Sequence, residues 1–106
     1  MQLQTVLLEL EKTLNAGLIS EYPNSPFRYT IQAEAGKVYT RIVRGEIWGD
    51  STEVSNRSCY GFLKNEDQTL WKSAGWKAPA KNKARGLLSD LLDPAKVLPK
   101  WRYSIS

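Results

Sequence analysis

The sequence contains no histidine, and its 106 residues include only one cysteine and one methionine. Without histidine we expect no imidazole acid–base catalysis, and no zinc site, because such sites are built mainly from histidine and cysteine. Cys59 has neither a second cysteine for an internal disulfide nor a histidine to activate it as a nucleophile. These absences predict that the protein is not an enzyme and has no catalytic residues, no metal and no cofactor.

Long apolar runs are also absent. No uninterrupted stretch of the sequence approaches the roughly 20 residues that a membrane-spanning helix needs. The N-terminal residues lack the basic start and continuous apolar core of a secretion signal. We therefore expect a cytoplasmic protein that makes no contact with a membrane.

The composition is that of a folded chain, with 42% hydrophobic and 25% charged residues. Both values are typical of a globular protein, and this length accommodates one modest core, so residues 1–106 are predicted to form a single domain. Four Trp, five Tyr and two Phe are generous for this length. Because each buries a large apolar area, the aromatic residues should help to stabilise a small domain.

Residues 2–16 are predicted to form an amphipathic helix. Its apolar residues follow the spacing that lines one helical face: Leu3, Val6, Leu7, Leu10 and Leu14. Gly17 follows as a stop signal. The helix is expected to pack on a sheet, and the alternative is a homodimer through this helix, because Leu8 widens the apolar face.

Alternating apolar and polar residues predict strands at 27–32, 37–47, 57–64 and 69–72. Gly45 is expected to mark a bulge or kink in the second strand. In the third strand, simple alternation places Cys59, Gly61 and Leu63 on one face and Ser58, Tyr60 and Phe62 on the other. The polar residues 65–68 connect the last two strands as a hairpin.

Residues 83–92 resemble a short helix that ends near Pro94, and residues 101–105 alternate like a final edge strand. Consecutive strands joined by hairpin turns favour an antiparallel sheet. The predicted fold is therefore α+β with two layers. An antiparallel sheet of four to five strands would be covered by the N-terminal amphipathic helix and a short C-terminal helix.

Positive charge is concentrated in one segment of a chain whose net charge is +4. Residues 68–89 contain no Asp or Glu, and they contain five cations: Lys72, Lys77, Lys81, Lys83 and Arg85. Trp71 and Trp76 lie among these cations. Lys and Arg hold phosphates and exposed aromatic rings stack on bases, so the segment is a candidate nucleic-acid-binding surface. The alternative is that both Trp residues are core and the cations are solvated surface.

A second basic group comes from the first two predicted strands, at Arg28, Lys37, Arg41 and Arg44. If it adjoins the first group, the protein has one broad cationic surface. The candidate nucleic-acid-binding residues are then Lys72, Lys77, Lys81, Lys83, Arg85, Trp71, Trp76, Arg41 and Arg44.

The stretch from Asp67 to Lys81 contains an acidic turn, a short aromatic strand ending in Lys, and the block Trp-Lys-Ala-Pro-Ala-Lys; Ala84-Arg85-Gly86 follows. In these features it resembles a group of short uncharacterised proteins encoded by tailed bacteriophages. The resemblance covers about residues 37–86. It implies a phage protein that acts in the cytoplasm of a bacterial host cell, and it implies no activity.

Three functions remain open at this point. The leading hypothesis is a non-enzymatic protein that contacts nucleic acid, through its phosphate backbone, with little sequence preference. The alternative is a protein-interaction module that inhibits or redirects an acidic host protein or a defence complex. A virion or assembly component is the third hypothesis.

Overall fold

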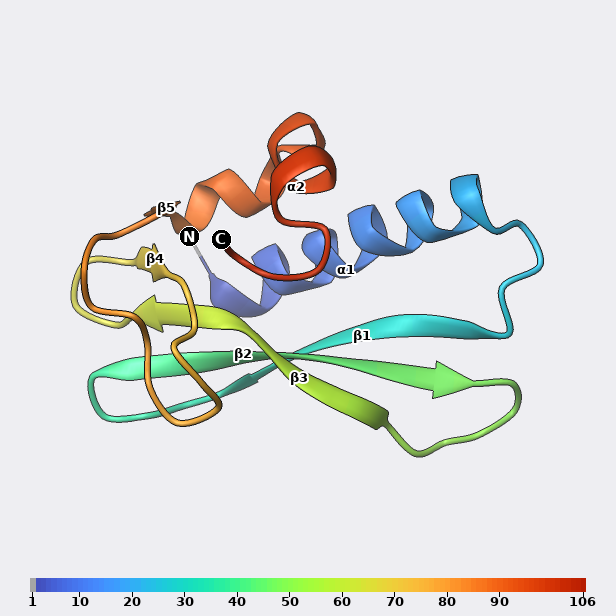
Figure 1. The fold of residues 1–106 in the computed structure, drawn as a ribbon, viewed down its shortest axis with the longest axis horizontal. Coiled ribbons are helices and arrows are strands. Elements are labelled where there is room, and N and C mark those ends of the chain that lie inside the picture. Colours follow the sequence, from blue (N-terminus) through green and yellow to red (C-terminus); the bar gives the residue numbers. More distant parts are fainter. Residues whose placement is uncertain (1) are drawn as a thin grey trace.

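A five-stranded antiparallel sheet forms one layer of the protein, and helices form the other (Figure 1). The computed structural model describes residues 2–106. The strands, in sheet order, are β1 (Phe27–Glu34), β2 (Tyr39–Trp48), β3 (Ser55–Lys64), β4 (Thr69–Trp71) and β5 (Gly86–Leu87). The helices are α1 (Leu3–Glu21), the 3₁₀ helix η1 (Leu88–Leu92) and α2 (Pro94–Lys100). The predicted α+β fold is confirmed.

The main core lies between α1 and the sheet. Leu10 and Leu14 of α1 are fully buried there, against Ile31 of β1 and Ile42 of β2. The predicted apolar stripe is therefore correct, but the helix does not stop at Gly17. A Cβ atom at Gly17 would lie 2.8 Å from Cδ2 of Leu98, so the missing side chain lets α2 approach α1 closely.

A bulge in β3 changes which of its residues enter the core. Ile42 of β2 pairs with Gly61, but the next residue of β2, Val43, pairs with Cys59, so Tyr60 is an extra residue. Tyr60 therefore lies in the main core, and the simple alternation predicted for this strand is wrong. A second register shift falls at Gly45, where the sequence predicted a bulge or kink.

The predicted helix over residues 83–92 is only partly correct, because residues 83–85 are not helical and residues 88–92 form a 3₁₀ helix. Pro94 begins α2 instead of ending a helix. The Asp93 carboxylate caps that helix by accepting a hydrogen bond from the backbone N–H of Ala95 at 3.0 Å. Proline suits a first helical turn because its missing N–H would have no helical partner there.

The predicted edge strand at residues 101–105 is wrong, since this segment forms bends. Its alternation arises from two buried anchors, Trp101 and Ile105. The backbone N–H of Ile105 donates to the carbonyl of Tyr60 at 2.8 Å, and the Tyr60 hydroxyl donates to the carbonyl of Trp101 at 2.6 Å. The bulged residue of β3 thus holds the segment that follows α2.

Candidate nucleic-acid interface

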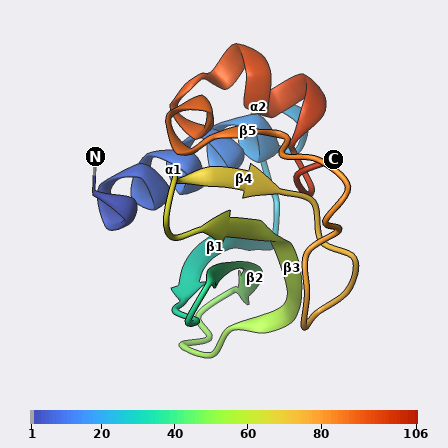
Figure 2. The same ribbon diagram turned by 90° about the vertical axis from the view of Figure 1, so that its left-hand side faces the viewer.

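Residues 72–85 form a long loop between β4 and β5, and we call it the basic loop. Figure 2 shows it descending beside β3 and returning to β5. Ser73 and Pro79 form an isolated antiparallel bridge, and the N–H of Ala80 donates to the carbonyl of Lys72 at 2.7 Å. Pro79 is buried. The Trp-Lys-Ala-Pro-Ala-Lys block is therefore the folded-back part of an ordered loop.

The four lysines of the basic loop, Lys72, Lys77, Lys81 and Lys83, are exposed. Within residues 2–106, no lysine of the basic loop forms an ion pair with a carboxylate at 4.0 Å or less. Arg85 is half-buried, and one of its terminal nitrogens donates to Oδ1 of Asn82 at 3.3 Å. The positive charge predicted for this segment is thus presented to solvent without local compensation.

Trp76 lies against two arginines that the sheet supplies. The guanidinium carbons of Arg41 and Arg57 are 4.6 Å and 5.3 Å from the centroid of its ring. Nε of Arg41 also donates to the Trp76 carbonyl at 2.8 Å. The Trp76 side of the loop is therefore attached to β2 and β3 by stacking and by a hydrogen bond, while Trp76 remains 39% exposed.

A single carboxylate fixes both arginines. Oε1 of Glu34 accepts a hydrogen bond from Arg41, and Oε2 accepts one from Arg57, each at 2.6 Å. Both hydrogen bonds lower the pKa of the Glu34 carboxyl group from its ordinary value, and the bond from Arg41 has the larger effect. We call Glu34, Arg41, Arg57 and Trp76 the Trp76 cluster.

Trp71 has a different environment from Trp76. It is half-buried, its Nε1 donates to Oγ1 of Thr69 at 2.8 Å, and its ring meets that of Tyr39 edge-on with centroids 6.2 Å apart. Tyr39 makes a similar contact with Phe62 at 6.3 Å. Trp71 therefore belongs to an aromatic row on this face of the sheet, and Trp76 is the more accessible of the two.

The two predicted basic groups merge only in part. Arg41 joins the basic loop, but Arg44 is three residues further along β2 and therefore lies on the opposite face of the sheet. The Arg44 guanidinium stacks between the rings of Tyr29 and Tyr103, 5.0 Å and 5.7 Å from their centroids. The condition for one broad cationic surface, that the second basic group adjoins the first, is therefore met by Arg41 and not by Arg44, because successive strand residues face opposite ways.

Sequence reasoning missed Glu34 and Arg57 as members of this surface. Glu34 lies directly opposite Arg41 in the β1–β2 hairpin. Opposite charges across a strand pair attract, but extending the first predicted strand to Glu34 leaves a two-residue turn that would pair Glu34 with Lys37 and not with Arg41. Nor does any signal identify Arg57, whose position depends on the bulge in β3.

A recess of about 340 Å³ lies next to the Trp76 cluster, between the β1–β2 turn and the basic loop. We call it the polar pocket. Its charged lining residues are Glu34, Arg41, Lys77 and Lys81, and Tyr39 and Phe62 also line it. Lys81 places its Nζ 5.9 Å from the centroid of the Tyr39 ring. Positive side chains thus surround a recess that has an aromatic wall.

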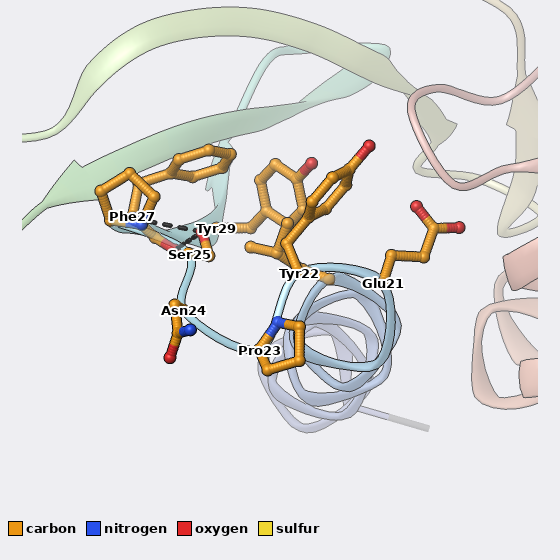
Figure 3. A pocket seen from close by; sticks show the side chains of 9 residues that line it. Glu21, Tyr22, Pro23, Asn24, Ser25, Phe27 and Tyr29 are labelled. Atoms are coloured by element: carbon orange, nitrogen blue, oxygen red, sulfur yellow. Dashed lines mark hydrogen bonds between the residues drawn. The ribbon is translucent and has the colours of Figure 1, made fainter.

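A larger recess, of about 480 Å³, lies where α1 turns into β1 (Figure 3). Its lining includes Tyr22, Pro26, Phe27 and Tyr29, and Glu21 is its only charged lining residue. Figure 3 shows the rings of Phe27, Tyr29 and Tyr22 on the same side of the connecting loop. We call this recess the aromatic pocket. Among residues 2–106, its lining provides no cation for a phosphate, and this recess was not predicted from the sequence.

Cys59 is half-buried in the bulged part of β3. Burial raises the pKa of its thiol, which keeps the sulfur protonated and weakly nucleophilic at neutral pH. Within residues 2–106, no group of three or more Cys, Asp or Glu side chains is placed to hold a metal ion. None of the helices in these residues has the length and apolar character needed to cross a membrane.

Comparison with known proteins gives one result. Residues 2–103 match the model of a family described as "Family of unknown function (DUF7717)". The chain belongs to this family. No curated protein and no solved structure matches it. The DUF7717 match spans α1, all five strands and α2, so the basic loop and both pockets lie within the part of the chain that defines the family.

Proposed function

We propose that this protein is a small, non-enzymatic nucleic-acid-binding protein that holds the phosphate backbone with little sequence preference. The carrying observation is the basic loop, whose lysines are exposed and have no carboxylate partner within residues 2–106. Lysines that neutralise phosphates release the counterions condensed on the nucleic acid, and this gain in free energy needs no contact with the bases. Lys ammonium groups act as point charges on phosphates, which supports binding without sequence readout.

The Trp76 cluster supports the same proposal. It provides an accessible aromatic ring beside the cations, and it fixes the loop before any ligand arrives. A surface that is already ordered loses less conformational entropy on binding. The combination of fixed cations and an exposed indole suits a polyanion with planar bases.

Fluorescence anisotropy with a labelled oligonucleotide, at about 50 and 200 mM salt, tests the proposal. We expect binding at low salt that weakens steeply at high salt. The variant Lys77→Gln/Lys81→Gln should bind more weakly and show a shallower salt dependence. The matched control, Lys12→Gln/Lys100→Gln, changes the net charge equally on the helical layer and should bind like the wild type.

No binding at low salt would reject the proposal, and so would equal losses in the two double variants. The second outcome would mean that net charge alone attracts the oligonucleotide. Circular dichroism of each variant should first show that its fold is unchanged.

The rival proposal is a module that binds a host protein, and the aromatic pocket favours it. An apolar recess with exposed Tyr22 at its rim suits an apolar side chain of a protein better than a phosphate. The aromatic pocket and the basic loop lie toward opposite ends of the molecule (Figure 1), so a partner that spans its length could place an acidic surface against the cations of the basic loop. A bacterial lysate treated with nuclease provides the test. A specific protein that the wild type retains, and that both Tyr22→Ala and Lys77→Gln/Lys81→Gln lose, would support the rival.

The resemblance of residues 37–86 to tailed-phage proteins supports a place of action in the cytoplasm of a bacterial host. Both proposals fit that setting, since each requires a rigid surface and no active site. A virion or assembly role would instead predict stable oligomers, which mass measurement during size-exclusion chromatography would detect.

A further inference from the structure

The polar pocket differs from the rest of the basic surface because it is concave. It lies between two chain segments that are close only in the folded protein, the β1–β2 turn and residues 77–81. Its volume of about 340 Å³ is near the lower end of the range of pockets that hold small molecules. A recess of this size suits one compact unit of a ligand and not the side of a rigid duplex.

The charges of the polar pocket favour an anion. Its single carboxylate, Glu34, already accepts hydrogen bonds on both oxygens, from Arg41 and Arg57. Two guanidinium groups thus already offset its charge, and within residues 2–106 it forms no ion pair with the two lysines at the pocket, Lys77 and Lys81. Both lysines belong to the exposed and uncompensated set described above.

The pocket also has an apolar side. Tyr39 and Phe62 line it, and their rings contact each other edge-on. Lys81 holds its ammonium group over the Tyr39 ring, so a ligand that engages both residues needs an anionic group next to a flat or apolar one. A nucleotide has this combination, with its phosphate next to its sugar and base.

We propose that the polar pocket holds one nucleotide of a single strand, with its phosphate at Lys77 and Lys81 and its base or sugar against Tyr39. This inference rests on the proposed nucleic-acid function and specifies its substrate as single-stranded. In a duplex the bases stay paired and stacked, whereas a single strand can turn one base into a recess and stack it on an aromatic ring. The protein should therefore prefer single strands to duplexes.

The binding site is ordered before the ligand arrives. The Ser73–Pro79 bridge closes the basic loop, and Arg41 binds the Trp76 carbonyl next to Lys77. The two walls of the pocket, the β1–β2 turn and residues 77–81, are thus held at a fixed separation. A substitution in one wall should therefore block the recess without moving the opposite wall.

Ala78 offers such a substitution. Its side chain is exposed and lines the polar pocket, whereas that of Ala74 is exposed in the same loop and does not line it. Ala78→Leu should fill part of the recess without changing any charge, and Ala74→Leu is the matched control. Both variants keep the backbone hydrogen bond in which the N–H of Ala74 donates to the carbonyl of Ala78.

The test compares a labelled thymidine single strand with a duplex of the same length, both at low salt, by fluorescence anisotropy. We expect the wild type to bind the single strand at least about fivefold more tightly, the gain expected from one stacked base. Ala78→Leu should reduce single-strand affinity to the duplex level and leave duplex affinity unchanged. Ala74→Leu should keep the preference. Thymidine monophosphate should compete with the single strand more strongly than inorganic phosphate does.

Three results would overturn the inference while leaving the proposed function intact. They are equal binding of single strand and duplex, an unchanged single-strand preference in Ala78→Leu, and equal competition by inorganic phosphate and thymidine monophosphate. The last result would assign the pocket to phosphate alone. If neither oligonucleotide binds at low salt, the proposed function itself fails, and this inference fails with it.

Discussion

Asn15 of α1 binds the backbone of Tyr29 in β1 through two hydrogen bonds. The Asn15 side-chain nitrogen donates to the Tyr29 carbonyl at 3.0 Å, and the Tyr29 N–H donates to Oδ1 of Asn15 at 2.8 Å. Glu11 likewise accepts from the N–H of Ile31 at 2.9 Å, and Oγ of Ser25 accepts from the N–H of Phe27 at 3.3 Å. Side chains thus occupy the outer edge of β1, where another strand could otherwise pair.

Replacing Asn15 by Leu should lower the free energy of unfolding. The change removes both hydrogen bonds and leaves a part-buried N–H and carbonyl of Tyr29 unpartnered, which costs about 1–3 kcal/mol for such a group. Urea denaturation followed by circular dichroism measures the loss, with the exposed α1 substitution Ser20→Ala as the control. A stability equal to that of the control would show that these bonds contribute nothing.

The same substitution should also expose the edge of β1 to other molecules. Size-exclusion chromatography of Asn15→Leu at increasing concentration should reveal association that the wild type does not show. If the variant and the wild type elute alike at every concentration, the hydrogen bonds of Asn15 do not protect the edge.

Gly61→Ala should destabilise the protein, whereas Gly75→Ala should not. A Cβ atom at Gly61 would lie 2.6 Å from Cδ1 of Ile105, so the segment around Ile105 would have to move away from β3. Overpacking of this kind typically costs about 1–3 kcal/mol. At Gly75 an added Cβ meets no heavy atom within 4 Å. Thermal denaturation of the two variants provides the comparison, and equal melting temperatures would contradict the tight contact.

Acid should release the Trp76 cluster. Because its two arginine partners lower the pKa of Glu34 below the ordinary 4.5, the carboxylate stabilises the cluster fully above pH 4.5. That contribution weakens as the pH falls below 4.5. It is lost once the pH has fallen through the lowered pKa that Glu34 has in the folded protein. In NMR spectra the Trp76 indole N–H resonance should shift over this range, and in Glu34→Gln it should stay constant. A shift of equal size in Glu34→Gln would assign the change to another group.

Tyr60→Phe should cost about 1–3 kcal/mol of stability. The substitution keeps the ring in the core but removes the buried hydroxyl that donates to the Trp101 carbonyl at 2.6 Å, so the carbonyl loses its partner. Tyr103→Phe removes an exposed hydroxyl and serves as the control in the same urea titration. A Tyr60→Phe protein as stable as this control would mean that the hydroxyl does not anchor residues 101–105.

The sequence predicted the elements that depend on local pattern. The apolar stripe of α1 and the hairpin from β3 to β4 follow from side-chain period and turn chemistry, and both are confirmed. The bulge at Tyr60 could not be predicted, because residues 60–63 are all buried and show no alternation in which an extra residue could be recognised. The alternation at residues 101–105 was misleading because Trp101 and Ile105 are buried by different neighbours and not by strand pairing.

As with the fold, the sequence predicted only part of the candidate site. The charge of the basic loop is visible in the sequence, since it requires only counting residues. The Trp76 cluster is not visible, because Trp76 belongs to a long loop, and no local pattern specifies the path that brings it to Arg41 and Arg57. Charge alone also did not reveal that Arg44 lies on the opposite face of the sheet from Arg41.

The contact between Ile105 and Gly61 also constrains when the protein can fold during synthesis. The core joins Val6 of α1 to Ile105, so the ribosome must release nearly the whole described chain before this core can close. At a translation rate of about 5–20 residues per second, α1 and the β1–β2 hairpin wait for seconds without the later residues that complete their core. During that wait, the side chains of Glu11 and Asn15 can already cover the edge of β1, since they need only α1 and β1 to be present.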